Sequence, residues 1–172
     1  MSKVITILED KLVPVAAWIA QNKYINGIRR AFIMMMPLLM IGSIFLMISA
    51  FPLPAYQRGM TSLFGEGWKD ILDIPVSATF SLIALYVAFL VAQQLAKQFE
   101  LDSIAVGLLS LASFLILTPL GHSTEHGAVI TFDWLGSKGM FVAMVIGVLT
   151  VKIFQFFVNR NILVKMPDGD TT

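Results

Sequence analysis

Both histidines of the chain fall within one short polar stretch, which reads His122-Ser123-Thr124-Glu125-His126. This H-x-x-E-H spacing is the pattern of inverted zinc metalloproteases. In such enzymes two histidines about one helical turn apart bind the metal, and a third protein ligand completes the site beside an open position for water. The stretch is therefore the first candidate for chemistry in this sequence.

The residues around the stretch favour a loop over the helix that a zinc site needs. Pro119 and Gly121 precede the motif, and Gly127 follows it. The chain has no cysteine, so a third ligand would have to be a carboxylate such as Asp133. We interpret residues 121–139 as a solvated loop or a re-entrant segment, which would need surrounding protein to satisfy its backbone. A zinc enzyme is retained only as an alternative.

Other signatures of catalysis are missing from the sequence. We find no G-x-G-x-x-G, no Walker loop and no G-x-S-x-G motif. The chain is expected to contain no catalytic residue and no metal site, and to use no cofactor.

The composition indicates a membrane protein. Of the 172 residues 57% are hydrophobic and only 13% are charged, against about 25% charged in a typical soluble domain. A soluble domain of this size could not hide so much apolar surface from water, so the lipid bilayer is the expected partner. The net charge of +1 and the lack of a basic run argue against nucleic acid as a partner.

Long apolar segments predict an all-α integral membrane protein with four transmembrane helices, at about 31–51, 76–96, 103–120 and 140–158. A helix of 21 residues is about 31 Å long, which matches the hydrocarbon thickness of a bilayer. The first three segments carry no charge. The fourth carries Lys152 near one end, where a lysine can reach the membrane interface.

The basic residues predict the orientation of the chain, because lysine and arginine concentrate on the cytoplasmic side. With four spans and both termini in the cytoplasm, nine of the twelve basic residues lie inside: Lys3, Lys11, Lys23, Arg29, Arg30, Lys97, Lys152, Arg160 and Lys165. Three lie outside, namely Arg58, Lys69 and Lys138. We therefore expect both termini in the cytoplasm.

The N-terminal segment 1–25 is amphipathic. Apolar residues recur at steps of four, four, three and four, as Val4, Leu8, Leu12, Val15 and Ile19. This spacing predicts one apolar helix face, and we expect the helix to lie in the cytoplasmic interface of the membrane. An ordinary surface helix packed on the bundle is the alternative. Residues 26–165 would then form a four-span scaffold domain, and 166–172 a linker tail.

Small residues at helical spacing predict close packing between the spans, since helices in lipid associate through such residues. The candidate packing residues are Gly42, Ala84, Ala88, Ala92, Gly107, Gly139, Ala143 and Gly147. The alternative is that small residues are common in any membrane helix. No Asp, Glu or Arg lies inside a predicted span, so we expect these helices to act as a scaffold and not to carry ions.

Three stretches, taken in this order along the chain, are similar to one known family. They are 12–16 with 26–32, 36–38 and 41–43; then 92–96 with Asp102 and Gly107; and last 135–143 with 164–169. On these residues the chain resembles the N-terminal part of the membrane-embedded IIC permease of bacterial sugar phosphotransferase systems. The most similar branch is the one for lactose, cellobiose and diacetylchitobiose.

The resemblance implies a scaffold and homodimerisation part in the bacterial inner membrane, belonging to a permease for a β-linked disaccharide such as cellobiose or diacetylchitobiose. Family members are more than twice as long. A later domain carries the sugar site, and separate cytoplasmic IIB and IIA subunits phosphorylate the sugar. We accordingly expect this chain to be truncated after its linker tail, to hold no substrate-binding residue and not to transport sugar alone. A self-contained small oligomeric membrane channel or interaction scaffold is the alternative.

Overall fold

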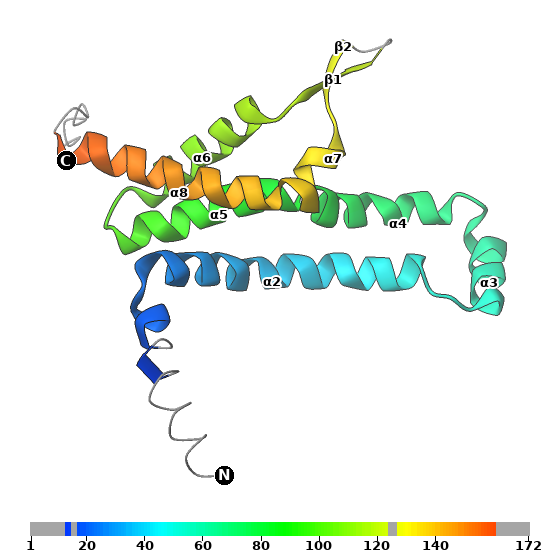
Figure 1. Cartoon of the computed structure of the whole chain (residues 1–172). Coiled ribbons are helices and arrows are strands. Elements are labelled where there is room, and N and C mark those ends of the chain that lie inside the picture. The colour runs from blue at the N-terminus through cyan, green and yellow to red at the C-terminus, as the bar shows by residue number, and fades with distance from the viewer. Residues whose placement is uncertain (1–12, 15–16, 124–126, 161–172) are drawn as a thin grey trace, which may run out of the picture.

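The structure, a computed structural model, describes residues 13–14, 17–123 and 127–160 and is mostly helical (Figure 1). Its helices are α2 (Lys23–Ser49), α3 (Pro54–Phe64), α4 (Trp68–Val76), α5 (Ile83–Gln98), α6 (Ser103–Leu117), α7 (Phe132–Leu135) and α8 (Ser137–Asn159). Strands β1 (Leu120–Ser123) and β2 (Gly127–Ile130) form an antiparallel hairpin between α6 and α7. The sequence predicted an all-α fold. The described part differs from this in one place, because the segment after α6 pairs as two strands.

Helix α5 is the centre of the bundle. Helices α2, α6 and α8 all pack against it, and α6 also contacts α8 (Figure 1). The side chains of α5 that have no exposed surface are Ala84, Val87, Ala88, Val91, Ala92, Leu95 and Ala96. At about 100° per residue they span roughly half of the helix circumference, and three helices pack on α5, so the core of the bundle is built around α5 and not between four equivalent helices.

Helix α2 begins eight residues before the predicted span. Asn22 caps it, with its side-chain oxygen accepting hydrogen bonds from the backbone N–H groups of Tyr24 and Ile25. Hydropathy marks where a helix meets lipid, whereas a cap marks where its hydrogen bonding starts. The helix continues through Pro37.

Only a small part of the predicted interfacial helix is described. Residues 13–14 and 17–21 are helical, and the side chains of Trp18 and Ile19 are exposed. Residues 1–12 and 15–16 of the segment 1–25 lie outside the described residues, as does the predicted tail 166–172, while Lys23 to Ile25 belong to α2.

The second apolar segment is longer than predicted, because α4, a π-helical turn η1 (Ser77–Ser81) and α5 run on as one helical stretch from Trp68 to Gln98. Pro75 has no N–H to donate, and the wider turn follows it. Hydroxyl groups satisfy the carbonyls there: Thr79 Oγ1 lies 2.9 Å from the carbonyl oxygens of both Pro75 and Val76. Tyr86 donates its hydroxyl to the Ala78 carbonyl at 2.9 Å.

Helix α6 is shorter than the predicted span 103–120. Asp102 caps its start, accepting from the N–H groups of Ile104 and Ala105 at 3.1 Å each. It ends at Leu117, since Thr118 precedes Pro119 and takes an extended conformation. Fifteen helical residues are about 22 Å long, less than a hydrocarbon core.

Three helical stretches within the described residues are long and apolar enough to cross a membrane, namely α2, Trp68–Gln98 and α8. Helix α8 extends from Ser137 to Asn159 and contains the predicted span 140–158. The shorter apolar helix α6 makes a fourth member of the bundle.

Candidate functional site

The packing surface of α5 is lined by three of the predicted small residues. Ala84, Ala88 and Ala92 recur every four residues and each is 0% exposed. Their short side chains allow neighbouring helices to approach the α5 backbone closely.

The side of α8 that faces α5 also carries small residues. Ala143 is 0% exposed. A Cβ atom added to Gly147 would lie 3.1 Å from Val91 Cγ1 and 3.4 Å from the backbone nitrogen of Ala92. At Gly147, α8 therefore lies directly against Val91 and the backbone of Ala92, with no side chain of its own between the helices.

The other three predicted glycines lie at contacts of their own. A Cβ on Gly139 would collide with the carbonyl oxygen of Trp134, where α7 joins α8. On Gly42 of α2 it would collide with the side chain of Thr79 in η1, and on Gly107 of α6 it would lie 2.8 Å from Phe89 of α5.

One close-contact glycine was missed by the sequence reasoning. A Cβ on Gly27 of α2 would lie 2.5 Å from Leu95 Cδ2 of α5. Gly27 and Ala31 stand four residues apart, which is the signal that could have identified them. It was overlooked because Gly27 precedes the uncharged stretch that starts at Ala31.

Two buried polar side chains link the helices. Ser110 of α6 is 0% exposed and donates its hydroxyl to the Ala88 carbonyl of α5 at 2.7 Å. Gln94 of α5 is buried, and its Nε2 lies 2.7 Å from Met34 Sδ of α2. These contacts bind helices together without any ionisable group.

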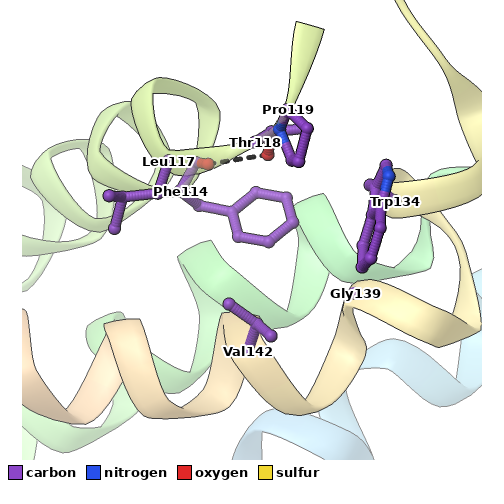
Figure 2. A pocket seen from close by; sticks show the side chains of 7 residues that line it. All are labelled: Phe114, Leu117, Thr118, Pro119, Trp134, Gly139 and Val142. Atoms are coloured by element: carbon purple, nitrogen blue, oxygen red, sulfur yellow. Dashed lines mark hydrogen bonds between the residues drawn. The ribbon is translucent and has the colours of Figure 1, made fainter. Parts of the chain in front are cut away.

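A pocket of about 170 Å³ opens where α6, α7 and α8 meet (Figure 2). Its lining is almost wholly apolar and consists of Phe114, Leu117, Thr118, Pro119, Trp134, Gly139 and Val142. The Thr118 hydroxyl is already used, because it donates to the Phe114 carbonyl at 2.7 Å. None of the seven lining residues is ionisable, so the pocket offers no acid, base or nucleophile.

The described part of the H-x-x-E-H stretch lies in a strand and not in a helix. His122 lies in strand β1, opposite Ala128 of β2, and residues 124–126 lie outside the described part of the chain. Asp133, the proposed third ligand, instead forms an exposed ion pair with Lys138 at 3.7 Å. Within the described residues, no group of three or more His, Asp or Glu is placed to hold a metal ion.

Comparison with known proteins gives consistent matches. The family model "Phosphotransferase system, EIIC" matches residues 29–169. The chain is 42% identical to the cellobiose-specific EIIC component of Geobacillus stearothermophilus, over 98% of this chain and 40% of the relative. It is 40% identical to the lichenan permease IIC component of Bacillus subtilis, over 98% of this chain and 39% of the relative.

A solved structure agrees with these matches. The crystal structure of the transporter ChbC, the IIC component of the N,N'-diacetylchitobiose-specific phosphotransferase system, superposes with a TM-score of 0.84 at 39% identity. The alignment covers 94% of this chain and 40% of that one. The chain thus spans about 40% of the length of the relatives it matches. With sequence and fold in agreement, the chain belongs to the phosphotransferase system EIIC family and corresponds to the N-terminal part of such a sugar permease.

Proposed function

We propose that this chain is the scaffold and homodimerisation part of a phosphotransferase permease for a β-linked disaccharide such as cellobiose or diacetylchitobiose. The observation that carries the proposal is the match of nearly the whole chain to 40% of a cellobiose-specific EIIC component. The sugar-binding residues would lie in the portion of the permease that the chain does not cover.

The chemistry of the described residues supports a scaffold role. The core is mostly apolar, and its buried polar side chains bond to backbone carbonyls or, for Gln94, to the sulfur of Met34. Helices α2, α5, α6 and α8 contain no Asp or Glu. Transport of ions or protons ordinarily needs ionisable groups at membrane depth. Residues 26–165 would hold a separate transport domain in the bacterial inner membrane, while cytoplasmic IIB and IIA subunits phosphorylate the sugar.

Transport measurements test this proposal. Cells that lack their own cellobiose permease and express only this chain should take up labelled cellobiose at background rate. Uptake should appear when the segment of the Geobacillus relative that the chain does not cover is expressed with it, together with the IIB and IIA subunits. Cells expressing the full-length relative are the positive control.

Two outcomes would contradict the proposal. Cellobiose uptake by the chain alone would place a complete transport site within it. Ion conductance by the purified chain in a planar bilayer would favour the alternative of a small self-contained channel.

The orientation is part of the proposal: four spans, with α6 and residues 118–120 making the third crossing, and both termini in the cytoplasm. Basic residues gather at one end of the bundle, where Lys23 lies 5.4 Å from the Phe99 ring and Lys152 lies 5.4 Å from the Tyr24 ring. This arrangement fits the concentration of positive charge on the cytoplasmic side.

Because the chain has no cysteine, single cysteines report the orientation without background. Gly59→Cys in α3 should react with a membrane-impermeant maleimide added to intact cells, and a Cβ there meets no atom within 4 Å. Asn159→Cys, at the exposed end of α8, should react only after the cells are opened. Labelling of Asn159→Cys in intact cells would refute a cytoplasmic C-terminus.

A further inference from the structure

An apolar groove runs along the surface between α2 and α8 and shares no lining residue with the pocket of Figure 2. It has a volume of about 310 Å³ and is lined by Ile28, Phe141, Met144, Val145, Val148 and Leu149. No lining side chain is polar, so the groove suits a hydrocarbon occupant.

The groove ends at a cation. Phe141, Val145, Val148 and Lys152 follow one another at steps of four, three and four residues, so they lie on one face of α8. Lys152 is exposed, and its Nζ lies 5.4 Å from the ring centroid of Tyr24, one helical turn before Ile28 of the groove. The lysine therefore stands at the end of the groove nearest the start of α2.

The length of the groove matches one leaflet of a bilayer. Phe141 and Lys152 are eleven residues apart on α8, which is about 16 Å along a helix. This is about half of the ~30 Å hydrocarbon core. The apolar lining thus reaches about mid-membrane when Lys152 is at headgroup level.

We infer that this groove binds an anionic phospholipid, with an acyl chain along the apolar lining and the headgroup phosphate at Lys152 Nζ. The occupant must be apolar over one leaflet and negative at its end, and a phospholipid satisfies both conditions. A second copy of this chain is the competing occupant, since Glu100 and Asp102 lie at the same end of the bundle as Lys152. The cross-linking experiment below distinguishes it from a phospholipid.

Competition between two lipids tests the inference on the full chain. The purified protein is delipidated in detergent, mixed with equal amounts of phosphatidylglycerol and phosphatidylcholine of identical acyl chains, and analysed by native mass spectrometry. The wild-type chain should retain phosphatidylglycerol about fivefold over phosphatidylcholine, from one lysine near an anionic headgroup. Lys152→Gln should reduce this ratio to about one. Lys138→Gln, at the opposite end of the same helix, should leave it unchanged.

A second pair of variants tests the groove itself. Leu149→Trp should lower the retention of both lipids, because the larger side chain fills the groove. Ile104→Trp is the matched control, since Ile104 is similarly exposed on α6 and does not line the groove. Both changes are made at exposed positions, and circular dichroism checks that the helices remain formed.

Three results would overturn the inference. The first is equal retention of the two lipids by the wild-type chain, and the second is an unchanged preference in Lys152→Gln. The third is efficient cross-linking of Val148→Cys between two copies in micelles containing phosphatidylglycerol, which would show that a second copy covers the groove.

Discussion

Replacing Gly139 with alanine is expected to lower the stability of the protein by about 3 kcal/mol, at the upper end of the range for overpacking. The added methyl group would collide with the carbonyl oxygen of Trp134. A backbone atom cannot rotate away as the tip of a side chain can, so the join between α7 and α8 must shift. Thermal unfolding in detergent, followed by circular dichroism, should show a midpoint roughly 10 °C lower.

Gly59→Ala is the matched control for Gly139→Ala. Gly59 lies inside helix α3, and a Cβ there would meet no atom within 4 Å. Alanine in an open helical position stabilises by about 0.5–1 kcal/mol relative to glycine. If the two variants unfold at the same temperature, the close contact at Gly139 does not limit packing.

Replacing Gly147 with leucine is expected to separate α8 from α5, with a loss of about 3 kcal/mol or more. The Cβ alone would lie 3.1 Å from Val91 Cγ1, and the three remaining carbons of leucine would have no room between the helices. Close approach of backbones is what holds helices together in lipid, where no hydrophobic drive favours their association. Besides a lower unfolding midpoint, size-exclusion chromatography in detergent should show a broadened or shifted peak.

The control for Gly147→Leu is Val145→Leu on the same helix. Val145 is 43% exposed and faces away from α5, so one extra methylene there has space to occupy. Its midpoint and elution volume should match the wild type. If Gly147→Leu has the unfolding midpoint and elution volume of the wild type, Gly147 does not contribute to the packing of α8 on α5.

The positions of the long helices could be predicted from sequence, but their ends could not. The apolar stretches 31–51 and 140–158 lie almost wholly within α2 and α8. Hydropathy responds to contact with lipid, whereas a helix continues as long as its backbone bonds are satisfied. The segment from Lys23 to Arg30 contains charged and polar residues and is still helical. The segment from Trp68 to Val76, which contains two aspartates, is helical as well.

The hairpin and the π-helical turn lay beyond the sequence argument. Four residues pair with four across β1 and β2, too short a run for alternation to stand out. Gly127, with a φ of +71°, sits just where the second strand begins. The π-helical turn depends on hydroxyl groups reaching freed carbonyls, and only a three-dimensional arrangement identifies Tyr86 as the donor to Ala78.

For the candidate site, the sequence supplied residues but not their partners. The spacing of Ala84, Ala88 and Ala92 predicts a packing face on their helix. It does not indicate that α2, α6 and α8 all pack against that one helix. Whether each of the eight small residues is needed for packing stays a prediction, which the variants above test at Gly139 and Gly147. The lipid groove could not have been predicted, since it needs Tyr24 and Lys152, 128 positions apart, to lie side by side.

The central place of α5 has a consequence for how the molecule is assembled. Helix α2 is synthesised before α5, but the surface of α5 on which it packs includes Gln94 and Leu95, which lie 45 and 46 residues after the end of α2. During that interval α2 stands in the membrane without its main neighbour, and α8 later docks on a helix that is already half covered. The bundle can therefore assemble only once α5 has been made, although synthesis runs from one end of the chain to the other.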